Sequence, residues 1–304
     1  MTNYPTSTRK PADAGLRLTG QYAGIRDYYT IAGPDYAAWS RDFNMHFGYC
    51  KYPADLFSLK KMLYRMNDIV LDRLEIPAER PCQIADLGCG VGTVARYAAK
   101  KFPHATLTGI TIVDAQIAKG NELISKEHLA GKVKLVNDNF EDIGFENETF
   151  DRAYALESAC HAEGSDKEYF IAEMTRILKM GGSFCIADGF LKNGEKKPWL
   201  FNKIYSRIIN CWALPGFGNI HEFTSTLKKY GLKEIRVNEI SLRIAPSVAY
   251  VPWTCIKFLF KEWWKNKSLH MEKERWNNVT APLLGMVLGL YRKHFGYYLI
   301  SGKK

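Results

Sequence analysis

The hydrophobic positions between residues 83 and 187 follow two alternating patterns. Short hydrophobic runs, typical of buried parallel strands, are separated by longer segments whose hydrophobic residues recur at helical spacing. The short runs predict strands at Gln83–Leu87, Ala105–Ile110, Val133–Val136, Arg152–Leu156 and Ser183–Ala187. The longer segments predict helices at Val91–Phe102, Ala115–His128 and Lys167–Lys179. Strands that alternate with helices in this way predict an α/β fold with a doubly wound parallel sheet.

Two segments far along the chain are expected to complete this sheet. His221–Tyr230 has helical spacing and ends at Gly231, and Lys233–Arg243 alternates like a strand. Phe295–Ser301 is a last run of residues that favour strands. We therefore expect two strands from the C-terminal part to join the central sheet.

Three stretches outside the sheet are rich in aromatic residues, namely residues 1–80, Phe190–Gly218 and Ala245–Arg292. Each falls where an open α/β sheet receives covering elements, so we expect helical cap elements over one pocket. The resulting division is an N-terminal helical cap (1–80), an α/β core (81–190), a cap insertion (191–220), a continuation of the core (221–244), a helical cap insertion (245–292) and a final core strand (293–304).

One segment of the last cap, Cys255–Trp264, has an amphipathic pattern. Ile256, Leu259, Phe260 and Trp263 follow helical spacing, and lysines occupy the other faces. Two interpretations remain open. The hydrophobic stripe either packs on its own domain or lies on a membrane surface.

The charge of the chain is concentrated near its end. The chain carries a formal net charge of +10, and the 48 residues from Lys257 onward contain ten basic and three acidic residues, so they hold +7 of it. A positive excess favours an anionic partner, such as a phosphorylated metabolite or a phospholipid surface. Any electrostatic partner, a peripherally contacted membrane surface included, is therefore expected to meet the C-terminal part. No appended nucleic-acid-binding module can be recognised, so no nucleic-acid partner is expected.

The cysteines and the first residues of the chain bear on the cellular compartment. Seven scattered cysteines without a C-x-x-C pair predict neither a disulfide framework nor a structural zinc site. The first twenty residues lack the hydrophobic run of a secretory signal, and the hydrophobic stretch Ala281–Tyr291 is too short to span a bilayer. We therefore expect a cytoplasmic protein.

The most informative motif is the run Asp86-Leu87-Gly88-Cys89-Gly90-Val91-Gly92, which follows the first strand and opens a helix. Glycines at such a turn let the backbone approach a ligand, and the helix N-terminus offers free N–H groups. The dinucleotide fingerprint requires a third glycine at position 93, where this chain has Thr93. A nucleotide-like cofactor other than NAD is therefore expected.

The acidic residue followed by G-x-G-x-G resembles the first motif of the class I S-adenosylmethionine-dependent methyltransferases. The segments Leu107–Thr111, Asn137–Phe140, Phe150–Glu157 and Ile177–Gly182 are similar to later motifs of this family. The resemblance extends from Ile84 to Asp188 and implies a Rossmann-like fold with S-adenosylmethionine as cofactor. It implies a cofactor site made of Asp86, Gly88, Gly90, Thr111, Gln116, Asn139 and Phe140.

Two positions of this site depart from the family pattern. Thr111 stands where many members have an acidic residue for the ribose, and Asn139 stands where the adenine segment commonly has Asp. Both side chains still form hydrogen bonds, because threonine supplies a hydroxyl and asparagine supplies both a donor and an acceptor.

The stretch Glu157-Ser158-Ala159-Cys160-His161-Ala162 resembles the E-x-x-C-H-A stretch of sterol C-methyltransferases, and more loosely tocopherol methyltransferases. Carboxyl ends of strands face the ligand crevice in an open α/β sheet, so His161 is expected near the transferred methyl group. It is either a proton acceptor or a histidine that hydrogen-bonds to a loop carbonyl. Glu157 is expected to act in acid–base chemistry or to orient the pocket backbone or cofactor.

Aromatic residues upstream predict the substrate cavity. Small-molecule members of the family often carry an aromatic-Gly-aromatic segment in the cap, which resembles Phe47-Gly48-Tyr49 here. Tyr49, His46, Phe47 and Tyr28 are therefore the expected substrate-binding residues, and Tyr29 beside Tyr28 is a further candidate for the cavity lining. The alternative is that these aromatics are ordinary core.

The expected reaction is methylation of a double bond in a lipophilic isoprenoid. Such methylation creates a carbocation, which requires aromatic faces to stabilise it and a base to remove a proton. The net charge favours a prenyl diphosphate, such as geranyl or farnesyl diphosphate, as the substrate, which would place the enzyme in the terpenoid branch of secondary metabolism. No metal is expected for methyl transfer itself, and Mg²⁺ is expected only as a companion of a diphosphate substrate.

Other functions remain open. The same scaffold serves N- and O-methylation of natural products or lipids and C-methylation of sterols. An RNA or protein methyltransferase and a non-catalytic cofactor-binding regulator are less consistent with the motifs.

Overall fold

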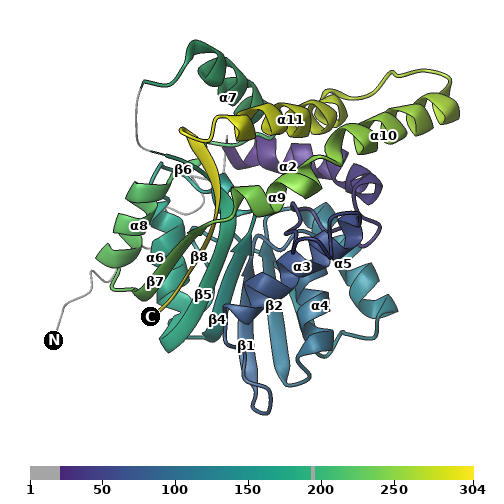
Figure 1. Ribbon diagram of the computed structural model, residues 1–304. Helices are drawn as coiled ribbons and strands as arrows, with labels where there is room; N and C mark the ends of the chain where they lie inside the picture. The colour runs from purple at the N-terminus through teal and green to yellow at the C-terminus, as the bar shows by residue number, and fades with distance from the viewer. Residues whose placement is uncertain (1–20, 193–195) are drawn as a thin grey trace.

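The computed structural model describes residues 21–192 and 196–304, and its centre is one eight-stranded sheet (Figure 1). The strands are β1 (Cys82–Leu87), β2 (Ala105–Thr111), β3 (Val133–Asn137), β4 (Phe150–Leu156), β5 (Leu178–Leu191), β6 (Gly218–Asn219), β7 (Lys233–Glu239) and β8 (Phe295–Lys303). Their order is β3-β2-β1-β4-β5-β8-β7, and β6 pairs with β5. The first five strands are parallel, whereas β8 runs antiparallel to both β5 and β7. This arrangement confirms the Rossmann-like α/β fold.

Helices cover both faces of the sheet and one of its ends (Figure 1). The α-helices are α2 (Gln21–Ala32), α3 (Leu59–Asp72), α4 (Thr93–Lys101), α5 (Asp114–Lys126), α6 (Glu168–Ile177), α7 (Trp199–Cys211), α8 (Ile220–Lys229), α9 (Ser241–Val248), α10 (Val251–Asn266) and α11 (Lys273–Leu290). Two short 3₁₀ helices are η1 (Gly33–Ala38) and η2 (Ala159–His161). In the part of the chain that the structure describes, no helix is long and apolar enough to cross a membrane.

The two faces of the sheet bury alternate residues, as the pleat of a strand requires. On β5, Phe184 and Ile186 pack toward α6 and α8, whereas Cys185 and Ala187 pack toward α3 and α4. Helix α3 belongs to the predicted N-terminal cap (1–80), yet its buried side chains pack in this second core layer. The N-terminal segment thus contributes both to the core and to the cap.

Two predicted boundaries were wrong. The helix predicted over Lys167–Lys179 ends at Ile177, because Leu178 already pairs with Phe150 in the sheet. The strand predicted over Lys233–Arg243 ends at Glu239, and α9 begins at Ser241. Ile244 is buried against the core from that helix, and this burial favours helical spacing over strand alternation.

The cap consists of α2, η1, α7, α10 and α11, which lie over one end of the sheet (Figure 1). Helices α7 and α11 pack through Phe201, Ile208 and Leu288, and α10 packs on α11 through Phe258 and Val279. Because these helices bury hydrophobic residues against one another, they cover the sheet without filling the space beneath them.

Arg275 connects three cap elements. Its guanidinium donates two hydrogen bonds to Asp35 of η1, both 2.8 Å long, and one of 3.1 Å to Glu262 of α10. All three side chains are largely buried. The hydrogen bonds that Arg275 donates to Asp35 and Glu262 raise the pKa of Arg275. The hydrogen bond from Arg275, together with its positive charge, lowers the pKa of Glu262. The cap is therefore held together by charge as well as by hydrophobic contact.

We predict that Arg275→Met destabilises the fold, because Asp35 and Glu262 would lose their partner while remaining largely buried. The expected loss is about 3 kcal/mol of unfolding free energy, measured by denaturant titration. Arg292→Met is the matched control, because Arg292 pairs with Glu239 at a more exposed position. It should cost less than about 1 kcal/mol. Equal losses in the two variants would contradict a special role of Arg275.

Candidate active site

All seven predicted cofactor residues line one cavity at the carboxyl ends of the first three strands. Asp86 lies in β1 and Gly88 and Gly90 in the turn after it, whereas Thr111 ends β2. Gln116 comes from α5, and Asn139 and Phe140 follow β3. Carboxyl ends of neighbouring parallel strands open into one crevice, which explains why residues so far apart in sequence meet.

The glycine turn brings the backbone close to its neighbours. Gly88 has a φ of +87°, and a Cβ atom there would overlap the Cβ atom of Ser158. Gly90 has a φ of +54°, and a Cβ atom there would lie 3.3 Å from the sulfur of Met45. Both conformations favour glycine, and the turn leads directly into α4. The backbone N–H groups of Gly88 and Cys89 donate to the carbonyl of Ile110, and that of Gly92 donates to the carbonyl of Cys89. The N-terminus of α4 therefore offers the N–H groups that a ligand could use.

The polar groups of this cavity are varied. Asp86 is buried, and burial raises the pKa of its carboxyl to about 7. The Thr111 hydroxyl donates to Gln116 Oε1 over 2.7 Å, and Asn139 Oδ1 accepts from the backbone N–H of Glu141 over 3.0 Å. A carboxylate, a hydroxyl, two amides and the ring of Phe140 suit a ligand with an ammonium group, sugar hydroxyls and a purine. The residues present fit the cofactor that the sequence implies.

A second and larger cavity, of about 380 Å³, lies between the sheet and the cap. Its lining is mainly hydrophobic and includes nine aromatic residues, Tyr29, Tyr36, Trp39, Phe47, Trp212, Phe217, Phe258, Phe295 and Tyr297. Tyr29, Met45, His46, Glu157 and His161 line both cavities. The two spaces therefore meet at the turn that follows β4.

His161 lies at this junction, in η2. Its Nε2 atom is 3.0 Å from the hydroxyl of Tyr29, so it does not pair with a loop carbonyl, and its buried Nδ1 atom has no partner among the described residues. Burial, followed by the positive charge of Lys167, lowers the pKa of His161 to about 4. The ring is therefore neutral near pH 7 and accepts a proton through whichever nitrogen carries no hydrogen.

Glu157 joins three parts of the chain. Its Oε1 atom accepts hydrogen bonds from the backbone N–H of Phe47, over 2.7 Å, and from the hydroxyl of Tyr297, over 2.8 Å. Its backbone has a φ of +52°, which is unusual for a residue with a side chain. Burial, together with the charge of Asp188, raises the pKa of Glu157 to about 8. These contacts connect the end of β4 to the cap loop and to β8.

Two polar residues of the site were not predicted. Asp188 of β5 lines the large cavity and accepts hydrogen bonds from the N–H groups of Cys160 and Gly189, and burial raises its pKa to about 6. The Lys167 ammonium is buried behind the His161 turn and donates to the carbonyls of Ala162 and Gly216. No sequence pattern marks a lysine whose partners are carbonyl groups of distant loops.

Some of the predicted substrate residues line the large cavity and others do not. His46 and Phe47 line the large cavity, whereas Tyr28 and Tyr49 do not line either cavity. Tyr28 donates to Asn278 Oδ1, and Tyr49 packs against the core. Tyr29, beside Tyr28 in α2, faces the cavity instead, because one residue along a helix rotates the side chain by about 100°. The helical periodicity of this segment could have shown that Tyr28 and Tyr29 point to different sides of α2.

The lining of the large cavity contains carboxyl groups. Asp35, Glu157 and Asp188 line the large cavity, and no Lys or Arg appears among its described lining residues. Over residues 21–192 and 196–304, no group of three or more His, Cys, Asp and Glu residues is placed to hold a metal ion. The cavity thus suits an uncharged or cationic occupant better than an anionic one.

Comparison with known proteins identifies related chains. A family model described as "Methyltransferase domain" matches residues 84–182. A methyltransferase of Streptomyces halstedii is 30% identical over 73% of this chain and 77% of its own length. A sterol 24-C-methyltransferase of Neurospora crassa is 32% identical over 82% of this chain and 64% of its own length. A tocopherol O-methyltransferase of Arabidopsis thaliana is 31% identical over 54% of this chain and 47% of its own length. This chain thus spans about half the length of that relative.

Solved structures show the same fold. A geranyl diphosphate C-methyltransferase from Streptomyces coelicolor, solved with Mg²⁺, a substrate analogue and S-adenosyl-L-homocysteine, superposes with a TM-score of 0.67. It is 17% identical, and the superposition covers 93% of this chain and 97% of that one. At this identity the likeness concerns the fold.

We predict that Glu157→Gln makes stability less dependent on pH. Glutamine retains a carbonyl acceptor for Phe47 and Tyr297 but does not ionise. The folded-state pKa of Glu157, about 8, lies above its ordinary value of 4.5, so its contribution is fully present below the ordinary value and is lost as the pH rises through 8.

Scanning calorimetry between about pH 6 and about pH 9 should show a fall in Tm that is at least about 2 °C smaller in Glu157→Gln than in the wild type. Glu79→Gln, at an exposed position, is the control and should behave as the wild type does. A parallel fall in all three proteins would contradict the prediction.

Proposed function

Because this chain belongs to the family of class I S-adenosylmethionine-dependent methyltransferases, we propose that it adds a methyl group to a double bond of a lipophilic isoprenoid. The observation that carries this proposal is the meeting of the two cavities at His161. One cavity has the polar groups that a nucleoside cofactor requires, and the other is hydrophobic and aromatic. A neutral proton acceptor lies between them.

The cofactor would be held by the seven residues of the first cavity. The Asp86 carboxylate would accept hydrogen bonds from its ammonium group, and Thr111 with Gln116 would contact the ribose hydroxyls. Asn139 and Phe140 would contact the adenine ring. When bound, S-adenosylmethionine supplies an electrophilic methyl group, and the protein supplies orientation and exclusion of water.

The acceptor would lie in the larger cavity, whose aromatic lining supports the carbocation chemistry. Methylation of a double bond leaves a positive charge on a neighbouring carbon, and the faces of aromatic rings attract such a charge. Tyr29 and Tyr36 stack with ring centroids 6.4 Å apart, and Tyr297 of β8 lines the same cavity. The carboxyl groups of the half-buried Glu157 and the buried Asp188 add acceptors nearby.

His161 would complete the reaction by removing a proton from the carbon next to the cation. The new C=C bond forms from the electron pair of that C–H bond, so no further reactant is required. A pKa of about 4 makes His161 a weak base, yet a carbocation is a far stronger acid and transfers its proton readily. Tyr29, 3.0 Å from His161 Nε2, holds the ring in place.

The lining favours an uncharged isoprenoid, such as a sterol, over the prenyl diphosphate that the net charge suggested. A diphosphate inside the cavity would face Glu157 and Asp188 without a lysine or arginine among the described lining residues. A prenyl diphosphate would have to keep its charged end, with any Mg²⁺, outside this space. The similarity to a sterol 24-C-methyltransferase supports the same preference.

Methylation of oxygen or nitrogen is the alternative. The similarity to a tocopherol O-methyltransferase supports it, because a lipophilic phenol would also fit a hydrophobic aromatic cavity. In that reaction His161 would take the proton of the attacking group itself. The two functions differ in the atom that is methylated, which is carbon in the first and oxygen or nitrogen in the second.

We predict that the protein binds S-adenosylhomocysteine and that Gly90→Arg abolishes binding, because the arginine side chain would occupy the cofactor cavity. Isothermal titration calorimetry measures the affinity. Gly131→Arg is the matched control, because a side chain at Gly131 meets no atom within 4 Å, and it should bind as the wild type does. Absence of binding to the wild type would refute the assignment of the cofactor.

We predict that the purified enzyme methylates carbon in an isoprenoid. Sterols, geranyl and farnesyl diphosphate, tocopherol precursors and an indole amine would each be incubated with methyl-labelled cofactor, and mass spectrometry would locate the label. Label on carbon of an isoprenoid supports the proposal. Label on oxygen or nitrogen alone would replace it with the alternative.

In the same assay, His161→Ala should lower kcat by about 10²-fold or more, the usual size of a general-base effect, with little change in cofactor affinity. Tyr29→Phe retains the ring but loses the hydroxyl that contacts His161, so a smaller loss is expected. Unchanged turnover in His161→Ala would contradict a base at this position.

A further inference from the structure

Helix α10 presents hydrophobic side chains to solvent. Trp253, Ile256, Phe260, Trp263 and Trp264 are 58%, 58%, 61%, 44% and 62% exposed. At about 100° per residue they fall within an arc of about 100° on one side of the helix. This arc contains three of the four residues of the stripe that the sequence pattern identified, and it points away from the domain. Packing on the domain, the first of the two interpretations, does not describe this face.

The opposite side of α10 packs on the protein. Phe258 contacts Met271 and Val279 in a small hydrophobic core, and Glu262 binds Arg275. These contacts hold the helix in place without using the outer face. The exposed position of the tryptophans therefore follows from how the helix is packed.

Lysines accompany the exposed aromatic side chains. Lys257, Lys261 and Lys265 occupy the arc next to them, and Lys267 follows the last turn. The Lys257 Nζ atom lies 5.5 Å from the ring centroid of Trp253, and the Lys267 Nζ atom lies 4.2 Å from that of Trp264. Aromatic rings beside lysines whose charged ends extend past them are typical of helices at a membrane–water interface.

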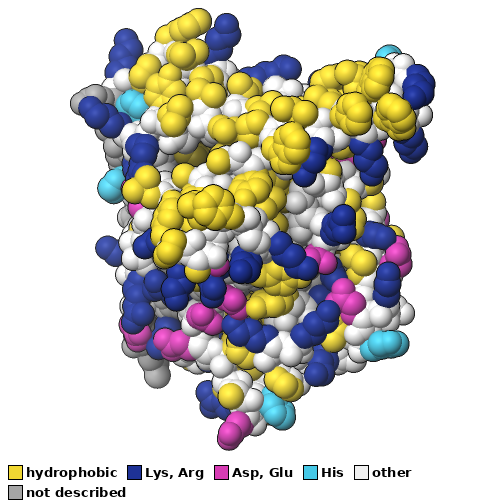
Figure 2. Space-filling model, turned by 45° about the vertical axis from the view of Figure 1, so that its right-hand side comes forward, with side chains coloured by type: hydrophobic (Ala, Val, Ile, Leu, Met, Phe, Trp, Pro, Cys, Tyr) yellow, Lys and Arg dark blue, Asp and Glu magenta, His cyan; other side chains and the backbone are white. Residues whose placement is uncertain are grey.

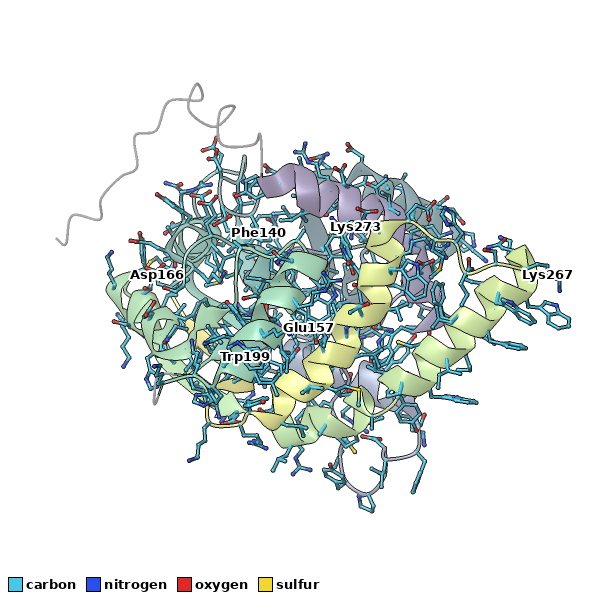
Figure 3. All side chains as sticks on the ribbon, turned by 90° about the horizontal axis from the view of Figure 1, so that it is seen from above. Phe140, Glu157, Asp166, Trp199, Lys267 and Lys273 are labelled. Atoms are coloured by element: carbon cyan, nitrogen blue, oxygen red, sulfur yellow. The ribbon has the colours of Figure 1, made fainter. Side chains whose placement is uncertain are left out.

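The figures show the same surface. Hydrophobic side chains gather over the upper part of the molecule, with Lys and Arg side chains beside them (Figure 2). Seen from above, α7, α11 and α10 form the upper layer, and Lys267 marks the end of α10 that projects furthest (Figure 3). Glu157 lies between α7 and α11 in that view, so the layer that carries the exposed face also covers the site.

The inner side of α10 reaches the large cavity. Val251, Thr254, Cys255 and Phe258 line that cavity, whereas the five exposed residues do not. One helix thus borders the cavity on one side and solvent on the other. A lipophilic molecule dissolved in a bilayer under this helix would have only a short way to the cavity.

We propose that α10 docks the protein on a bilayer that contains anionic phospholipids, with its aromatic face in the headgroup region and its lysines against the phosphates. Each lysine near such a surface strengthens binding about fivefold, which is the effect of about 1 kcal/mol. Burial of the exposed tryptophans and Phe260 supplies the hydrophobic part.

A second copy of this chain suits the face less well. A two-fold interface brings the same patch of both copies together, so the lysines of one α10 would meet those of the other. The only acidic residue of α10 is Glu262, which is already bound to Arg275 on the inner side. An anionic lipid surface supplies the opposite charge that a second copy lacks.

Vesicle flotation tests the proposal. Wild-type protein should float with mixed phosphatidylcholine–phosphatidylserine vesicles, bind pure phosphatidylcholine vesicles more weakly, and show a blue shift of tryptophan fluorescence on binding. The triple variant Phe260→Ser, Trp263→Ser, Trp264→Ser should lose at least tenfold in affinity. The variant Lys257→Gln, Lys261→Gln, Lys265→Gln should lose affinity for the mixed vesicles only.

The control variant is Phe57→Ser with Met180→Ser, which removes two exposed hydrophobic side chains outside α10 and should bind as the wild type does. All variants should retain binding of S-adenosylhomocysteine, which shows that they are folded. Vesicle binding requires no acceptor, so its outcome is independent of the proposed reaction.

Three results would overturn the proposal. The first is no binding of the wild type to the mixed vesicles, and the second is equal binding by wild type and triple variant. The third is a dimer, measured by light scattering, that the triple variant converts to a monomer without a change in vesicle binding, since the face would then belong to a second copy.

Discussion

The arrangement of the candidate active site depends on the hydrogen bonds of one half-buried carboxyl group. Glu157, at the end of β4, accepts from the backbone N–H of Phe47 and from the hydroxyl of Tyr297. These partners belong to the N-terminal cap loop and to the last strand, so one side chain joins the beginning, middle and end of the chain. His161 follows only four residues later in the chain and lies where the two cavities meet. Glu157 therefore ties the turn that carries His161 to the cap loop and to the last strand.

The space beside that turn exists because the cap helices pack mainly on one another. The α7–α11 and α10–α11 contacts and the Arg275 ion pairs give the cap its own stability. A cap that buried its hydrophobic residues against the sheet would close the cavity. The first cavity lies at the strand ends, whereas the cap helices cover the larger one, so a change in the cap would alter the larger cavity without disturbing the first.

Helix α10 shows the difference between what its hydrophobic sequence pattern predicts and what its packing in the folded chain determines. Its hydrophobic stripe is evident in the sequence, and helical periodicity identified which residues share a face. Periodicity does not state whether that face meets protein, lipid or water. In the folded chain Phe258 and Glu262 make the contacts with the domain, and the stripe is left outside.

The sequence by itself determined the α/β core, because hydrophobic periodicity and the glycine turn after the first strand are local features. Its resemblance to a methyltransferase family indicated seven of the residues that line the first cavity. It also indicated His161 through the stretch after β4. Tertiary structure decided the position of Lys167 behind the His161 turn and of Asp188 at the large cavity. Those roles arise from contacts between segments far apart in the chain, and such contacts leave no local pattern. The absence of lysine and arginine from the described cavity lining is of the same kind, since a net charge of +10 says nothing about where the charges end up.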